Sequence, residues 1–234
     1  MKEVWHGQFP VQVFCNLKSL VMDVCANISS AISGNLLQHL NSLEKLHVRN
    51  GDSLEEVFDL EELNADGDLK VLSQLSEFFL VDLPRLEHIW KKNHSEVLGF
   101  RNLKLMKIYN CSSLRYIFTP SVIWGLMQLQ KLEIKNCAMM EEIITMEREN
   151  DAVAIEKITF LQLNCLVLES LPNLTSFYSG RNTLVCPSLT TINISDCPKM
   201  ETFVFTHLKD ICTGIAPLFS ENVSLCTINL LSDW

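Results

Sequence analysis

Residues 102–118 read NLKLMKIYNCSSLRYIF, and the spacing of their apolar residues decides the fold. With the first leucine of the stretch numbered zero, apolar residues stand at offsets 0, 3, 5, 8, 11, 14 and 15: Leu103, Met106, Ile108, Cys111, Leu114, Ile117 and Phe118. The alternation around offsets 3 and 5 is typical of a strand with one buried face, because successive side chains of a strand point to opposite sides. The later spacing of three indicates a chain that turns away from the strand while its apolar side chains stay directed inward.

The same template recurs along the chain. Seven copies begin at Leu17, Leu43, Leu75, Leu103, Leu129, Leu163 and Leu189, and Leu225 begins a partial eighth. The steps between them are 26, 32, 28, 26, 34, 26 and 36 residues, mostly in or near the range of about 20–29 residues that leucine-rich repeats occupy. The longer steps contain Asp59–Asp68 and Thr145–Lys157, which we expect to be loops.

This periodicity predicts an α/β fold, a leucine-rich-repeat solenoid. One copy alone exposes its apolar stripe, whereas stacked copies bury it between them. We expect a curved, right-handed coil with a parallel sheet on the concave face and loops or short helices on the convex face. The chain is then a single domain over residues 1–234, with about eight repeats and strands near residues 20–22, 46–48, 78–80, 106–108, 132–134, 166–168, 192–194 and 228–230.

Both ends of the chain fall inside a repeat. Met1, Val4 and Trp5 match offsets 11, 14 and 15, and the eighth copy stops soon after Leu230. Because solenoids cover their terminal cores with capping units, we expect truncated repeats at both ends and a piece of a longer protein.

Charge and hydropathy narrow the function classes. The net charge of −9 argues against nucleic acid as the main partner, since phosphate recognition needs a concentrated basic face. No apolar run approaches the roughly 18 residues of a membrane-spanning helix, and residues 1–10 lack the apolar core of a secretion signal. The cytoplasm is therefore the expected compartment, with the nucleus as the other option.

Several cysteines occupy one repeat position. Cys25, Cys111, Cys137 and Cys197 stand at offset 8, where other copies carry leucine, and this predicts small buried apolar sites. Neither the nine cysteines nor the six histidines show metal-ligand spacing or a nucleophile motif. We therefore expect no metal, no cofactor and no enzymatic activity.

The remaining strand positions point out of the core and could contact a partner. Lysines gather on two neighbouring strands as a local basic patch, and Phe79 beside Val81 places apolar area among charges. The alternative is a generic solvated face. The hypothetical partner site comprises His47, Arg49, Phe79, Val81, Lys104, Lys107, Tyr109, Lys131, Glu133, Lys135 and Glu169.

Several phrases resemble a known family. VWHGQFP (residues 4–10), LPRLEHIW (83–90), CSSLRYIFTPS (111–121) and the Asn-Cys steps at 110–111 and 136–137 are similar to the carboxyl-terminal repeats of plant intracellular disease-resistance proteins. Those proteins join a coiled-coil segment, a nucleotide-binding domain and a leucine-rich tail. The resemblance implies a sensor that recognises a pathogen effector or a guarded host protein and restrains the nucleotide-binding switch.

The phosphate-binding loop of that switch is missing from this sequence, so no nucleotide role is carried over. Two other repeat classes remain as alternatives. One is an extracellular receptor-like protein, whose N-x-L-x-G-x-I-P motif is absent here. The other is a ubiquitin-ligase adaptor, whose repeats also place cysteine at offset 8 but continue differently.

Overall fold

The computed structural model describes residues 14–24, 27–60, 71–90, 99–123, 125–145, 157–178, 183–200 and 225–229. Some expectations from the sequence fall outside these residues. They concern the partial repeat at Met1, Val4 and Trp5, Cys25, Leu230, and residues 61–68 and 146–156 of the two long loops.

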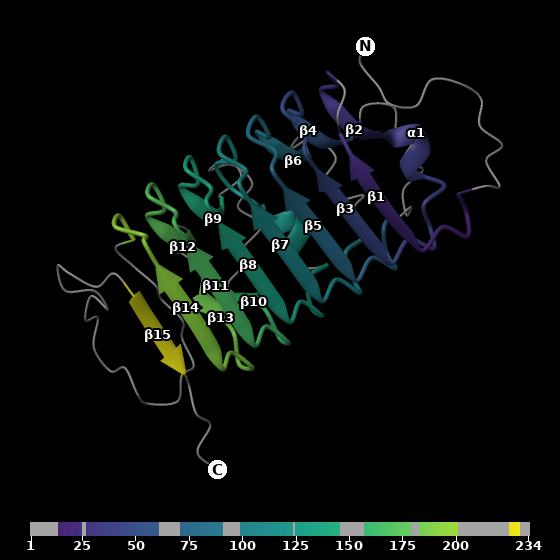
Figure 1. Ribbon diagram of the computed structural model, residues 1–234. Coiled ribbons are helices and arrows are strands. Elements are labelled where there is room, and N and C mark those ends of the chain that lie inside the picture. Colours follow the sequence, from purple (N-terminus) through teal and green to yellow (C-terminus); the bar gives the residue numbers. More distant parts are fainter. Residues whose placement is uncertain are drawn as a thin grey trace, which may run out of the picture.

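One long sheet runs through the molecule (Figure 1). In spatial order its strands are β1 (Ser19–Asp23), β3 (Lys45–Arg49), β5 (Glu77–Val81), β7 (Leu105–Tyr109), β8 (Lys131–Lys135), β11 (Cys165–Glu169), β14 (Thr191–Ser195) and β15 (Leu225–Asn229). From β1 to β14 neighbouring strands are parallel, and each residue pairs with the residue at the same offset of the next repeat. The predicted leucine-rich-repeat solenoid is confirmed.

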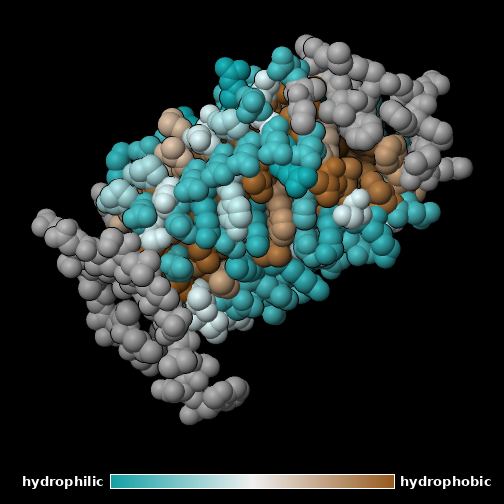
Figure 2. All heavy atoms as spheres, in the orientation of Figure 1, coloured by the Kyte–Doolittle hydropathy of each residue, from teal (hydrophilic) through white to brown (hydrophobic). Residues whose placement is uncertain are grey.

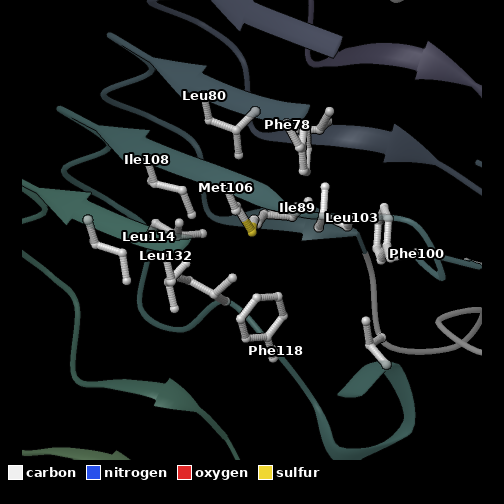
Figure 3. Close-up of a cluster of buried hydrophobic side chains, with 14 of the residues drawn as sticks. Phe78, Leu80, Ile89, Phe100, Leu103, Met106, Ile108, Leu114, Phe118 and Leu132 are labelled. Carbon is white, nitrogen blue, oxygen red and sulfur yellow. The ribbon is translucent and has the colours of Figure 1, made fainter. Parts of the chain in front are cut away.

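The core lies under the long sheet, where offsets 3 and 5 point. The offset-5 column is buried throughout and consists of Met22, Val48, Leu80, Ile108, Ile134, Leu168 and Ile194. Figure 3 shows Phe78, Met106 and Leu132, which occupy offset 3 of three adjacent strands, directed to the same side as their offset-5 neighbours. Each large apolar side chain buried in this way contributes about 1.5–3 kcal/mol, so the column-by-column register has a strong energetic cause.

The opposite side of the coil contains short strands as well as the expected loops and helices. Three short sheets form: β2 (Ser30–Ser33) with β4 (Glu56–Asp59) and β6 (His88–Trp90), β9 (Glu142–Ile144) with β12 (Ser176–Tyr178), and β10 (Lys157–Thr159) with β13 (Thr183–Val185). The helices are single turns, α1 (Gly34–Leu37) and α2 (Pro120–Ile123). The periodicity did not predict these strands. They form because stacking brings equivalent segments of neighbouring repeats side by side, where their backbone groups pair. In β2, β4, β6, β9 and β12 these segments contain offsets 14 and 15, whereas β10 and β13 lie just before the first leucine of the next repeat.

The last strand differs from the expectation of a parallel eighth repeat near residues 228–230. β15 pairs with β14 in the antiparallel direction, with Ile192 beside Ile228. β14 would otherwise present unpaired N–H and C=O groups at the edge of the sheet, and such groups accept a strand of either direction. The step before Leu225 is 36 residues, compared with 26 in a regular coil, so β15 is not held to the parallel direction by a coil of regular length.

The turns that leave β3, β5, β7, β8, β11 and β14 each have a left-handed residue at offset 7. These residues have φ between 53° and 58°, and they are Asn50, Asp82, Asn110, Asn136, Ser170 and Asp196. Asparagine and aspartate tolerate this conformation better than most residues. Their side chains also form a ladder, since Asn136 Nδ2 donates to Asn110 Oδ1 at 2.9 Å and Asn110 Nδ2 donates to Asp82 Oδ1 at 2.5 Å. The turn chemistry therefore repeats together with the core.

Offset 8 follows directly, and two of its cysteines, Cys111 and Cys137, belong to the core, whereas Cys197 is only partly buried. Cys111 and Cys137 are fully buried, which confirms the predicted packing role for these two. Their thiols donate to the carbonyl oxygens two residues earlier, at 3.5 Å and 3.4 Å. At the same offset of the second repeat, a Cβ on Gly51 would lie 3.0 Å from Leu83 Cδ2, so neighbouring side chains already fill that space.

The left-handed turn generates a prediction on stability. Asn136→Gly and Asn136→Val both remove the side-chain hydrogen bond to Asn110, but only valine is strained at φ 55°. We expect the valine variant to be less stable than the glycine variant by about 1–2 kcal/mol in urea unfolding. Equal stabilities for the two variants would show that the turn tolerates a β-branched residue.

The cysteine burial generates a second prediction. In the folded chain, iodoacetamide should alkylate the partly exposed Cys165 at least about tenfold faster than Cys111 and Cys137, because reaction needs an accessible thiolate. Burial also raises the pKa of Cys186 to about 12, so this thiol should react slowly too. Peptide mass spectrometry over a time course gives the rates, and an unfolded sample in urea is the control in which the rates converge.

Candidate functional site

The long sheet has one face turned away from the core, and we call this surface the strand face. It carries the side chains at offsets 2, 4 and 6, which alternate with the buried residues along each strand. In Figure 2, hydrophilic residues predominate over the strands, with smaller hydrophobic areas between them. Because neighbouring strands are in register, side chains of one offset form rows across the sheet.

The offset-4 row has an aromatic centre on β5. The rings of His47 and Phe79 are stacked, with centroids 4.2 Å apart and an interplanar angle of 10°. From the other neighbouring strand, Lys107 Nζ lies 5.3 Å from the centroid of the Phe79 ring, a distance typical of a cation–π contact. Burial lowers the pKa of His47 below its ordinary value, which keeps its imidazole neutral at pH 7.

Next in the same row, Glu133 on β8 forms ion pairs with three lysines. Its carboxylate is 3.1 Å from Lys131 Nζ, 3.4 Å from Lys135 Nζ and 3.8 Å from Lys107 Nζ. Burial alone would raise the pKa of Glu133, but hydrogen bonds from Tyr109 and Lys131 and the nearby lysine charges outweigh it and leave the pKa below its ordinary value. Glu133 is therefore ionised at neutral pH although only 8% of the residue is exposed.

The offset-6 row continues the same network. The Tyr109 hydroxyl hydrogen-bonds to Glu133, and burial together with this bond raises the pKa of the phenol well above its ordinary value. Lys135 Nζ lies 6.0 Å from the centroid of the Tyr109 ring and 2.7 Å from Glu169 Oε2. We use the name Glu133 cluster for Lys107, Tyr109, Lys131, Glu133 and Lys135.

Closer to the amino-terminal end, the strand face carries exposed ion pairs. Arg49 donates to both carboxylate oxygens of Asp23, at 2.9 Å and 2.6 Å, and Lys45 Nζ lies 2.7 Å from Glu77 Oε1. Asp23, Lys45 and Glu77 were not among the expected site residues. Opposite charges at the same offset of adjacent repeats were the signal that could have found them, because register makes such residues neighbours.

The expected site residues are placed as follows. The Glu133 cluster, Phe79 and His47 come together on β3, β5, β7 and β8, while Val81 lies beside Tyr109 in the register. Glu169 joins through Lys135, Arg49 is paired with Asp23, and Lys104 lies at the residue before β7.

The structure corrects two details of the expected site. The lysines do cluster on and beside β7 and β8, but three of them share the carboxylate of Glu133, so the patch is less basic than the lysines alone suggest. Phe79 is also less accessible than its sequence position suggests, because His47 and Lys107 cover its ring from both sides. The reason in both cases is side-chain conformation, which brings charges and rings of neighbouring strands into contact.

The described part of the chain contains no group of three or more histidine, cysteine, aspartate or glutamate side chains placed to hold a metal ion. Within the same residues, no helix is long and apolar enough to span a membrane.

The in-register coils, the parallel sheet and its solvent-facing side chains together define a leucine-rich-repeat protein. A family model described as plant disease resistance protein RPS2-like, leucine-rich repeats, matches residues 1–138 and 122–211. The chain belongs to this family, which agrees with the resemblance found in the sequence.

Two curated relatives carry names of the same kind. The chain is 24% identical over 200 residues to the probable disease resistance protein At4g27220 of Arabidopsis thaliana, a match that covers 76% of the chain and 21% of the relative. It is 28% identical over 127 residues to the probable disease resistance protein At5g47260 of the same plant, covering 53% of the chain and 13% of the relative. The chain thus spans about a fifth of the first relative's length, and no solved structure matches it.

The Glu133 cluster generates a pH prediction. Since the pKa of Glu133 is lowered on folding, its contribution to stability is present above about pH 4.5, its unfolded value, and is lost as the pH falls through the folded value. Glu133→Gln should therefore destabilise the chain by about 1–2 kcal/mol at pH 7 and by much less near pH 3. Urea unfolding at both pH values measures the difference, and a pH-independent gap would contradict the ion-pair explanation.

Proposed function

We propose that this chain is a protein-binding sensor module of plant innate immunity and that the strand face, centred on the Glu133 cluster, binds the partner. The partner is a pathogen effector or a guarded host protein. In a longer receptor the module also restrains a nucleotide-binding domain, in the cytoplasm or the nucleus. Membership of the plant disease resistance family supports the biological setting.

The observation that carries the proposal is the ordering of polar and aromatic side chains on a rigid sheet. Tyr109 is held by Glu133, Lys135 is held by Glu133 and Glu169, and Phe79 is held between His47 and Lys107. A partner that binds such a surface loses little side-chain entropy on this side of the interface. Tyrosine is also among the residues most often responsible for binding energy at protein interfaces.

The arrangement of the strand face also favours a macromolecular partner over a small ligand. The Glu133 cluster lies on β7 and β8 with Phe79 beside it on β5, and the side chains stand in rows on a sheet. Small ligands prefer concave, mostly apolar pockets that surround them, whereas broad polar and aromatic surfaces are typical of protein–protein contacts.

The test compares two double variants as baits for proteins from healthy and infected leaf extracts. Lys107→Ala with Tyr109→Ala alters the cluster, while Arg115→Ala with Glu141→Ala removes a more exposed ion pair outside the long sheet. We expect the first variant to lose captured partners by about 30-fold or more and the second to match the unaltered chain, as quantified by mass spectrometry. Partners retained by the cluster variant, with its circular dichroism unchanged, would place binding elsewhere.

A further inference from the structure

The charges over β7 and β8 do not cancel. On the strand face, β7 and β8 carry three lysines, Lys107, Lys131 and Lys135, and one carboxylate, in a chain whose net charge is −9. A fourth lysine, the exposed Lys104, directly precedes β7. The strand face therefore has a local positive excess at this place, although the molecule as a whole is acidic.

The carboxylate groups of this region are already engaged. Glu133 is nearly buried and shares its two oxygens among three ammonium groups. Glu169 is paired with Lys135 at 2.7 Å. A basic partner would find few acceptors here, because both carboxylates have close cationic neighbours.

Donors, by contrast, remain open. Lys107 Nζ is 3.8 Å from the nearest Glu133 oxygen, which is longer than a hydrogen bond. Because an ammonium offers three N–H donors, Lys107 can still donate to a partner. Lys104 is exposed and forms no ion pair within the described residues. Glu133 Oε2 also has no hydrogen-bond partner, but this oxygen is buried. The unused capacity that a partner can reach is therefore that of donors, on Lys107 in β7 and on Lys104 directly before it.

Apolar side chains border the open donors. Phe79 and Val81 on β5 and Leu105 on β7 are each partly exposed on the strand face. A partner that placed a carboxylate on Lys107 would bring its neighbouring residue over these side chains. Apolar contact would then exclude water from the ion pair and strengthen it.

From this charge complementarity we propose that the strand face over β7 and β8 binds an acidic segment of a protein, with its carboxylates on Lys107 and Lys104 and an apolar side chain beside Phe79 and Leu105. This inference rests on the proposed function and specifies its partner class. Nucleic acid is disfavoured as the occupant because a phosphate backbone needs an extended basic face, whereas the positive excess here is confined to β7 and β8 of a chain with net charge −9.

The test uses three fluorescein-labelled dodecapeptides that share a leucine at every fourth position. All other positions are glutamate in the first peptide, glutamine in the second and lysine in the third. Fluorescence anisotropy with the full chain should show the glutamate peptide binding at least about tenfold more tightly than the glutamine peptide, with no binding of the lysine peptide. Raising the salt from about 50 to about 300 mM should weaken binding of the glutamate peptide. No preference for glutamate at peptide concentrations up to about 1 mM would overturn the proposal.

Two double variants with the same change in net charge locate the contact. Lys104→Gln with Lys107→Gln should weaken glutamate-peptide binding about tenfold, whereas Arg115→Gln with Lys199→Gln, outside the strand face, should leave it unchanged. Equal losses in both variants would mean a long-range charge effect and would overturn the assignment to β7. If the chain binds a thymidine oligonucleotide more tightly than the glutamate peptide, the proposed acidic protein segment is the wrong class of partner.

The outcomes separate this inference from the proposed function. If leaf partners depend on Lys107 and Tyr109 but the glutamate peptide shows no preference, the strand face still binds protein and only the acidic partner class fails. If neither depends on the cluster, both fail.

Discussion

The lateral pairing of successive coils is the constraint on which the rest of the molecule depends. No single repeat can bury its own apolar stripe, so each coil is stable only against its neighbours. The seven parallel strands pair offset by offset without a slip. A shift of one residue in any strand would turn its core column to solvent and its polar column into the core.

The strand face follows from the same constraint. Once offsets 3 and 5 are buried, offsets 4 and 6 must point outward, and the fixed spacing of parallel strands sets which side chains meet. The stack of His47 on Phe79 and the contacts of Lys135 with Tyr109 and Glu169 are all same-offset neighbours. A rigid core thereby orders a polar surface, which is the property that a binding module requires.

Membership in the plant disease resistance leucine-rich-repeat family gives this surface its setting. The relatives are much longer than the matched region, so the chain corresponds to part of their architecture. The chain is only 24% and 28% identical to these relatives. Such low identity is compatible with one fold, because packing fixes only the apolar offsets and leaves the outward offsets free to vary. Those free positions are where different members of such a family can differ in their partners.

The sequence by itself determined the repeat, the positions of the long-sheet strands β1, β3, β5, β7, β8, β11 and β14, the core columns and the burial of Cys111 and Cys137, because each of these depends on local periodicity that recurs along the chain. It also indicated which side chains face outward. Only the tertiary structure decided that three lysines of the expected basic patch share the carboxylate of Glu133 and that His47 and Lys107 cover Phe79. It likewise decided the short strands on the opposite side of the coil and the antiparallel direction of β15. These features depend on side-chain conformation and on contacts between coils, and neither is encoded in the spacing within one repeat.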